Sequence, residues 1–321
     1  MGDWRVIGLD RGDHGVRVDR VLLRHLRDAK GASRNRIQKW IDAGDVLVNG
    51  VAPPRAAWRI QPGDELRVRV SELPTRERPR AEDLPVEVLY EDDDVLAVNK
   101  PSGIVVHPSF KNTSGTLING LLTLARSWPS GSTPALLGRL DKQTSGLVLV
   151  TKRTEIHAAL QRAMAARRVD KDYLAMVHGR PSPARGTIDL ALDRDPWDRR
   201  RVTVTDRGGQ PSVTRYERVS TADDCSLVRC RLITGRTHQI RVHLAAKGWP
   251  IVGDATYSTL RLGGDGKRPP PRSGPAFGRQ ALHSWRIAFR HPRTGRELVI
   301  EAPLPDDMRA LAESTGLGVP P

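Results

Sequence analysis

One stretch of the sequence, residues 138–152, places an acidic side chain next to a run of apolar residues. Asp141 lies in its polar first half, and Leu147-Val148-Leu149-Val150 lies in its second half. A short apolar run between polar residues is typical of a buried strand, so Asp141 is expected on a loop at the end of a core strand, where reactive side chains often lie. Arg139 is two residues away and would point the same way in an extended chain. The two could form a reactive site or a solvated ion pair in a surface turn.

The charge of the chain is its most informative overall property. Its 321 residues include 52 lysines and arginines against 37 acids, which gives a net charge of +15 and a pI near 10.6. Clustered cations bind the phosphates of nucleic acids, so we expect an RNA or DNA partner, although an arginine-rich proteome would give the same excess. Aromatic residues make up only 4% of the chain, which argues against extensive surfaces for base stacking.

Several other classes of protein are disfavoured. The two cysteines, Cys225 and Cys230, lack the spacing of zinc ligands and are expected to be buried thiols in a reducing compartment. No secretory signal and no window of 18 apolar residues is present, so we expect a cytoplasmic protein without a membrane partner. There is no phosphate-binding loop, dinucleotide-binding glycine motif or nucleophile elbow. We therefore expect no cofactor and no metal, and a monomeric chain.

Residues 15–70 have the pattern of a small separate domain. Apolar residues at helical spacing predict two helices, and Ser33 is a suitable N-cap for the second. Asn-Gly within residues 46–51 is typical of a hairpin, and a strand is predicted at residues 65–70. The second helix carries three cations that are expected to face outward, Arg34, Arg36 and Lys39. Such a face could bind RNA or only be solvated. The Pro- and Arg-rich residues 71–84 predict a linker.

From Val86 onward the sequence favours an α+β domain over residues 85–305. Strands are predicted at residues 86–90, 95–98, 147–150, 172–177, 227–233, 281–290 and 297–302, with several more within 186–220. Helices are predicted at residues 116–125, from Thr154, from about residue 239 to Gly248, and from Met308. Residues 259–279 are rich in Gly, Pro and Arg and predict a mobile loop. Residues 306–321 are expected to form a C-terminal tail.

The helix that begins near residue 239 brings together histidines and arginines. His238 and His243 are five residues apart and lie on different faces of a helix. Neither has an evident metal-binding partner, and like His107 each is expected to be structural unless further evidence gives it a role. Arg236 and Arg241 make the start of this helix cationic. The sequence thus offers one acid on a loop and a cationic helix start as its candidates for chemistry.

Four segments in this order resemble the RluA family of RNA pseudouridine synthases: Asn99–Gly103, Arg139–Leu147, Lys171–Ala175 and Thr234–His243. The resemblance covers roughly residues 85–305. It implies the pseudouridine synthase fold, a mixed and largely antiparallel sheet with flanking helices. Residues 15–70 resemble the S-four-type RNA-binding module, and with this module the layout is similar to the D-type members that modify large-subunit ribosomal RNA.

The resemblance also implies roles for single residues. Asp141 would be the catalytic aspartate, and Arg241 would pair with it. Tyr173 would stack on the uracil and take part in removing the proton at its carbon 5, while Arg139 would fill the space left when the uridine flips out. Two further sets of residues are expected to contact RNA, namely Lys100, Arg236 and His238 in the matching segments and Arg34, Arg36 and Lys39 in the N-terminal module.

Physical chemistry is consistent with these roles. The reaction breaks a glycosidic bond, turns the base and rejoins it through carbon, so it requires neither a redox change nor a group donor. The base must leave its stack, which costs roughly a few kcal/mol, and a side chain that fills the gap offsets part of that cost. Asp141 must be ionised, and an adjacent arginine typically lowers the pKa of a carboxyl group by ~1–3 units and fixes its orientation.

The expected function is therefore site-specific isomerisation of uridine in RNA, with large-subunit ribosomal RNA as the expected target. A transfer-RNA target and an RNA-binding assembly factor without activity stay open as alternatives, as does the choice between attack of Asp141 on the ribose, attack on the base and a glycal route. One position departs from the family, because Gly138 stands where a histidine is common before the Arg-Leu-Asp run.

Overall fold

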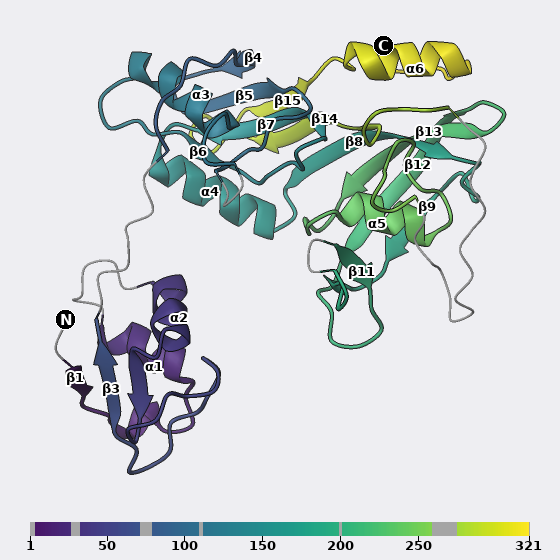
Figure 1. The fold of residues 1–321 in the computed structure, drawn as a ribbon. Coiled ribbons are helices and arrows are strands. Elements are labelled where there is room, and N and C mark those ends of the chain that lie inside the picture. Colours follow the sequence, from purple (N-terminus) through teal and green to yellow (C-terminus); the bar gives the residue numbers. More distant parts are fainter. Residues whose placement is uncertain are drawn as a thin grey trace. The chain divides into compact units, whose positions relative to one another are not determined.

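The computed structural model describes residues 4–26, 33–70, 79–108, 112–198, 201–258 and 275–320. It divides into two compact units, Met1–Arg78 and Pro79–Pro321, which are considered separately below (Figure 1). Residues 259–274, most of the loop that the sequence predicts to be mobile, lie outside the described ranges. Within those ranges, no helix has both the length and the apolar character needed to cross a membrane.

The first unit packs two helices against a three-stranded antiparallel sheet with strand order β1-β3-β2. Its elements are β1 Trp4–Ile7, a 3-10 turn Arg11–Asp13, α1 Val18–His25, α2 Arg34–Asp42, β2 Val46–Val48 and β3 Leu66–Arg69. Ser33 caps α2 by accepting a hydrogen bond from the Arg36 amide, as the sequence predicts. β1 was not expected, because its four residues are mostly exposed and it is fixed by pairing with the distant β3.

The Asn-Gly turn is present, but it does not make the predicted hairpin. Asn49 and Gly50 have φ of 53° and 80°, the left-handed values that a tight turn of this kind needs. Beyond the turn only an isolated bridge joins Val48 to Val51, and the strand that pairs with β2 is β3. The unit has its own core, which includes the buried side chains of Val21, Leu22, Ile37, Trp40 and Leu66.

The second unit is built on a ten-stranded sheet of order β4-β5-β7-β14-β8-β13-β12-β9, with β15 beside β14 and β6 beside β7. All pairings are antiparallel except β7 with β14. The strands are β4 Glu87–Glu91, β5 Val95–Lys100, β6 Ala135–Leu136, β7 Ser145–Thr151, β8 Val169–His178, β9 Arg185–Asp189, β12 Val213–Thr221, β13 Cys225–Leu232, β14 Leu282–Arg290 and β15 Glu297–Glu301. The predicted mixed, largely antiparallel sheet is therefore confirmed.

Helices flank this sheet, and a short hairpin extends beyond it (Figure 1). The helices are α3 Leu117–Leu124 with the 3-10 turn Ala125–Ser127, α4 Thr154–Ala165, α5 Gln239–Ala246 and α6 Asp306–Thr315, and the hairpin consists of β10 Leu192–Arg194 and β11 Val202–Val204. Two apolar cores lie against the sheet, and Cys225 and Cys230 are buried as free thiols in the larger one.

Two segments are more firmly attached than their composition suggests. Residues 79–84, assigned to the linker, run along α3, where the Asn119 amide donates to the Arg80 carbonyl at 2.6 Å and the Thr123 hydroxyl donates to the Glu82 carbonyl at 2.6 Å. Residues 306–321, expected to be a tail, include α6, whose Met308 and Leu311 are buried in the main core. Tertiary packing, which local composition does not reveal, holds both segments in place.

The parallel contact between β7 and β14 depends on Gly146, the residue that follows the start of β7. Its φ is +105°, and a Cβ atom at this position would lie 2.2 Å from the Ser284 carbonyl oxygen. Only glycine allows the two backbones to come this close. Because Asp141 lies a few residues before Gly146, this close approach determines where the acid-bearing loop leaves the sheet.

Candidate active site

A pocket of about 500 Å³ opens beside the Asp141 loop. Three parts of the second unit enclose it: residues 138–144, the end of α4 with the start of β8, and residues 232–241, which lead from β13 into α5. These parts are far apart in the sequence and come together because β7, β14, β8 and β13 are adjacent in the sheet. The pocket lining includes six of the residues to which the sequence analysis gave a role, namely Arg139, Asp141, Tyr173, Arg236, His238 and Arg241.

Asp141 is the carboxylate of this pocket. Its side chain is 20% exposed, and its Oδ2 atom accepts a hydrogen bond of 3.0 Å from Nη1 of Arg241. The Nε2 atom of His238 lies 3.8 Å from the same oxygen. The contact between Asp141 and Arg241 spans one hundred residues and is the pairing that the family resemblance implies.

Arg241 is itself held in place by a second acid, Asp254. Its Nε and Nη2 atoms donate to the two oxygens of Asp254 at 2.7 and 2.8 Å. Asp254 is 1% exposed and also accepts from the amides of Thr256 and Tyr257. Burial opposes the charge of Arg241, but the hydrogen bonds and charges of Asp254 and then Asp141 outweigh it, so the pKa of Arg241 is raised and it stays a cation.

The backbone after Asp141 is tied to its neighbours. The Lys142 carbonyl accepts from the Gly103 amide at 2.8 Å and from Nζ of Lys100 at 3.2 Å. The next carbonyl, that of Gln143, accepts from Arg279 at 3.1 Å, and Arg279 is anchored by two hydrogen bonds to Asp307 on α6. These bonds fix the direction in which the Asp141 side chain points.

Lys100 lies outside the pocket, contrary to its expected place among the residues that contact RNA. It is 0% exposed, and its ammonium group donates to the carbonyls of Pro101, Ile104 and Lys142. Burial, helped by the positive charge of Arg279, lowers the pKa of Lys100 to about 8. Lys100 is therefore a buried residue that supports the backbone of the Asp141 loop.

Tyr173 lies in the wall of the pocket on β8, paired across the sheet with Cys230 of β13. Its side chain is buried, and burial raises the pKa of Tyr173 to about 12, an effect that the charge of Asp141 reinforces. The hydroxyl group is therefore protonated at neutral pH. A buried aromatic ring beside a carboxylate is suited to pack against a planar base.

His238 and Tyr257 close one side of the pocket. Nδ1 of His238 lies 2.7 Å from the Tyr257 hydroxyl, and the two rings meet edge to face. His238 has a φ of 55°, which is uncommon for a residue with a side chain. Burial lowers the pKa of His238 although the negative charge of Asp141 opposes this effect, so the ring is neutral at pH 7. The structural role expected for His243 is met by bonds to Thr214 and the Leu190 carbonyl.

The entrance of the pocket is cationic. Arg139 and Arg236 are exposed there, and Arg167 and Lys171 also line the pocket. The latter two were missed by the sequence analysis, since Arg167 lies in an unremarkable turn after α4. Lys171 belongs to one of the family segments, which was the available signal. Burial lowers the pKa of Lys171.

Gln239, the first residue of α5, joins the two sides of the segment that leads into this helix. Its side-chain oxygen accepts from the Thr234 hydroxyl at 2.9 Å and from the Arg236 amide at 3.0 Å. Its side-chain nitrogen donates to the carbonyl of Val213 and the hydroxyl of Thr214 on β12. The backbone of residues 234–238 is thereby fixed against the sheet. Sequence analysis gave Gln239 no role, because its partners lie on a distant strand.

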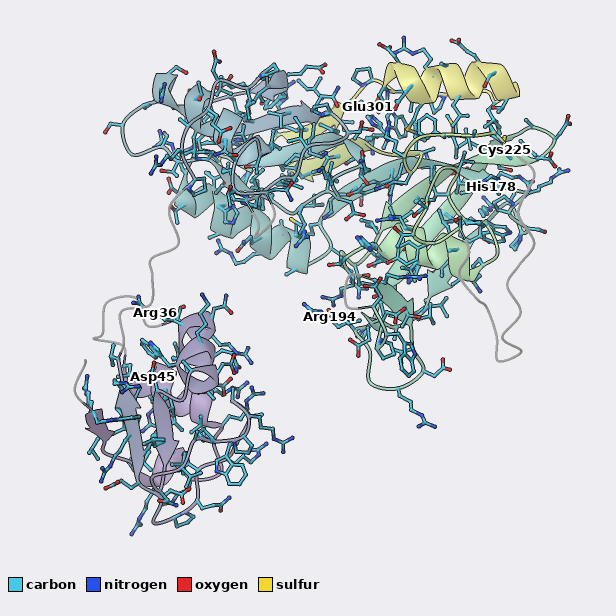
Figure 2. The ribbon with its side chains drawn as sticks, viewed as in Figure 1. Arg36, Asp45, His178, Arg194, Cys225 and Glu301 are labelled. Carbon is cyan, nitrogen blue, oxygen red and sulfur yellow. The ribbon has the colours of Figure 1, made fainter. Side chains whose placement is uncertain are left out.

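The three cations expected in the N-terminal module lie on α2 of the first unit, where Figure 2 labels Arg36. The guanidinium of Arg34 lies 3.6 Å from the buried carboxylate of Asp19, and Arg36 lies over the ring of Trp40. Lys39 is exposed. Arg34 therefore contributes to the structure of the unit as well as to its charge.

Among the described residues, one group has the composition of a metal site, Asp10, Asp13 and His25 in the first unit. Arg24 forms ion pairs with both of these acids, and Nε2 of His25 donates to Oδ2 of Asp13 at 2.8 Å. The carboxylates are thus already neutralised by a cation of the chain, and this cluster does not carry a metal-binding proposal.

Comparison with known proteins identifies the class to which this fold and pocket belong. The family model described as RNA pseudouridylate synthase matches residues 94–246, which include Asp141, Tyr173 and Arg241. Human RNA pseudouridylate synthase domain containing 4 shares the fold, with a TM-score of 0.59 and 24% identity over 73% of this chain and 95% of that chain. The chain belongs to the RNA pseudouridine synthases, which are isomerases.

Relatives over nearly the whole length place it more closely. The chain is 41% identical over 302 residues, 93% of each protein, to the uncharacterized RNA pseudouridine synthase YlyB of Bacillus subtilis. It is 40% identical to ribosomal large subunit pseudouridine synthase D of Xanthomonas campestris, with 92% of this chain and 88% of the relative covered. The corresponding protein of Nitrosomonas europaea is 36% identical, with 94% and 84% covered. The expected membership of the RluA family is confirmed.

Proposed function

We propose that this enzyme converts specific uridines of large-subunit ribosomal RNA to pseudouridine, with Asp141 as its catalytic aspartate. The observation that carries the proposal is the hydrogen bond from Arg241 to Oδ2 of Asp141, inside a pocket with a cationic entrance. Several relatives named as ribosomal large subunit pseudouridine synthase D support the choice of RNA. We propose in addition that the enzyme acts as a monomer in the cytoplasm, as the sequence analysis expects.

The proposed roles follow the steps of the isomerisation. The bond between C1′ of the ribose and N1 of the uracil breaks, the base turns, and a bond forms between C1′ and C5. The proton on C5 must then leave while N1 takes up a proton, so atoms and charge balance without a cofactor. We assign to Asp141 the role of nucleophile or base on the nucleotide, and to Tyr173 the roles of packing against the uracil and assisting at C5.

Entry of the target requires that the nucleotide leave its stack, which costs a few kcal/mol. Arg139 is exposed at the entrance, two residues from Asp141. We assign to it the role of filling the space that the flipped nucleotide leaves. Arg236 and His238 line the same entrance and are assigned to contacts with the RNA, while Lys100 is assigned to positioning the Asp141 loop.

We propose in addition that the first unit is an S-four-type RNA-binding module. Its second helix, α2, carries Arg34, Arg36 and Lys39. Lys39 is exposed and can contact a phosphate. Contacts of this kind supply affinity that depends on salt but little sequence information. The module would therefore hold the RNA, and the pocket would select the uridine.

The proposal is tested by mapping pseudouridines chemically, with carbodiimide and primer extension, in ribosomal and transfer RNA from a deletion strain and its parent. The proposal expects named positions of the large-subunit RNA to lose the modification and to regain it with the wild-type gene. Loss of transfer-RNA positions alone would contradict the target. Full modification of both RNAs in the deletion strain, together with a ribosome-assembly defect rescued by Asp141→Ala, would instead indicate an assembly factor.

A further inference from the structure

Trp197 stands out among the seven tryptophans of the chain. Its side chain is 94% exposed, although tryptophan is the largest aromatic residue and most of its surface is normally buried. It lies in the connection between β10 and β11, the hairpin that also carries Arg194 in Figure 2. None of the roles proposed above uses this side chain.

The turn that presents Trp197 is ordered by its own hydrogen bonds. Oδ1 of Asp195 accepts from the amides of Trp197 and Asp198 at 2.8 and 3.1 Å, as in an Asx turn. The Arg201 amide donates to the Asp198 carbonyl at 2.8 Å, and the Asp195 amide donates to the Arg201 carbonyl at 3.2 Å. The exposed ring is thus carried on a fixed backbone, which reduces the entropy that binding would cost.

The hairpin is attached directly to the wall of the active-site pocket. The Val202 amide donates to the Tyr257 hydroxyl at 3.0 Å, and that hydroxyl also bonds His238 of the pocket. Val202 and Val204 pack against the core formed by Tyr257 and Val242. Trp197 lies three residues beyond the end of β10, and three residues of extended chain reach about 10 Å. A nucleotide that flanks a target bound in the pocket would therefore be within reach of the ring.

The hairpin that carries Trp197 has charged residues of both signs. Arg194 is exposed on β10, and Arg201 lies over the ring of Tyr257 at 5.7 Å. Three acids, Asp193, Asp195 and Asp198, belong to the same hairpin, and the first two accept hydrogen bonds from backbone amides. An exposed planar ring on a hairpin attached to a pocket with a cationic entrance is suited to stack on an unpaired base of the RNA.

We propose that Trp197 stacks on an unpaired base of the RNA substrate near the target uridine. The inference rests on the proposed function, because it takes its partner from it. The stacked Trp197 ring adds a contact with the RNA outside the pocket. This contact selects targets in single-stranded or looped regions, since a paired base does not offer its face to the ring.

The test compares Trp197→Ala, Trp197→Leu and Trp197→Phe with the wild type on a large-subunit RNA fragment that the wild-type enzyme modifies. Stacking predicts that Ala and Leu raise KM by about 5- to 100-fold, with kcat unchanged, and that Phe restores most of the loss. Val299→Ala, at an apolar residue of β15 in the second unit that is 56% exposed and outside the pocket, is the control and should leave KM within about 2-fold.

Two outcomes would overturn the inference: an unchanged KM for Trp197→Ala, or equal rescue by Leu and Phe, which would indicate an apolar contact with a protein partner. Failure of the proposed function is distinguishable, because the wild-type enzyme would then modify no RNA. Equilibrium binding of the same fragment, with the same expected ranking of the variants, would test Trp197 in that case as well.

Discussion

Asp254 binds the guanidinium of Arg241 through two hydrogen bonds of 2.7 and 2.8 Å, and only one further nitrogen of this guanidinium reaches Asp141. The arginine is therefore fixed by an acid that has no access to the pocket, and it offers a defined edge to the acid that does. A single hydrogen bond at Oδ2 leaves Oδ1 of Asp141 without a bond to Arg241. Asp254 acts as a positioning residue for the Asp141–Arg241 pair.

Asp254→Asn should lower kcat by about 100-fold, because a small displacement of a positioning group is enough for a loss of this size. KM should change much less, since RNA contacts lie elsewhere. Steady-state kinetics on a ribosomal RNA fragment checks this split, and thermal unfolding reports any loss of structure. Asp306→Asn is the matched control, because the Asp306 side chain is 98% exposed. In a series of Asp254 variants, a loss of kcat that grows in proportion to the loss of melting temperature would indicate a purely structural role.

Gly146→Ala should destabilise the enzyme by about 3 kcal/mol or more, because the added Cβ would lie 2.2 Å from the Ser284 carbonyl oxygen and overpacking adds to the strain of a positive φ. Gly248→Ala separates the two effects, since Gly248 has a φ of +82° but no atom within 4 Å of a Cβ. Urea unfolding of both variants is the measurement. If the two variants lose the same stability, backbone strain alone is the cause and the close approach of β7 to β14 is unimportant.

Gly138→His restores the residue that is common in the family, yet it should not be neutral. Gly138 has a φ of +96°, so a residue with a side chain is strained there by about 1–2 kcal/mol. The site is open, with no atom within 4 Å of a Cβ. Gly278→His, at an open position without a positive φ, is the control in a thermal unfolding comparison. A Gly138→His variant as stable as this control would show that the loop adapts to the larger residue.

The raised pKa of Tyr173 predicts that the stability of the enzyme changes with pH in the alkaline range. Burial raises its pKa to about 12, above the ordinary value near 10, so the stability from its neutral hydroxyl is complete below pH 10 and is lost as pH rises toward 12. Relative to Tyr173→Phe, the wild type should lose about 1 kcal/mol between pH 9 and 11. Urea unfolding at pH 8, 9, 10 and 11 measures this. If the free energies of unfolding of the two proteins change in parallel with pH, Tyr173 has its ordinary pKa in the folded protein.

The sequence could locate the acid and the strands because both leave local signals. The apolar run after Asp141 became the central strand β7, and the alternating segments became the sheet. The pairing of Asp141 with Arg241 came from the family resemblance, since no local pattern joins residues one hundred positions apart. The N-terminal module had the predicted order of helices, while β1 was missed because its pairing partner is distant.

Other features depended on packing that no sequence pattern reports. Lys100 has the charge of an RNA-binding residue, but the chain folds over it and directs its ammonium group to three carbonyls. Asp254 and Gln239 act through bonds to residues on other elements. The C-terminal residues read as a tail because α6 is short, and its anchoring through Asp307 to Arg279 becomes visible only in the folded structure.

The role of Asp141 is the central claim, and it is tested most directly by release of tritium from carbon 5 of labelled uridine in ribosomal RNA. Wild-type enzyme should release tritium from its target position, and Asp141→Asn should release none above background while it still binds the RNA. Circular dichroism and RNA binding establish that the variant is folded. Tritium release by Asp141→Asn at a rate near that of the wild type would contradict the account.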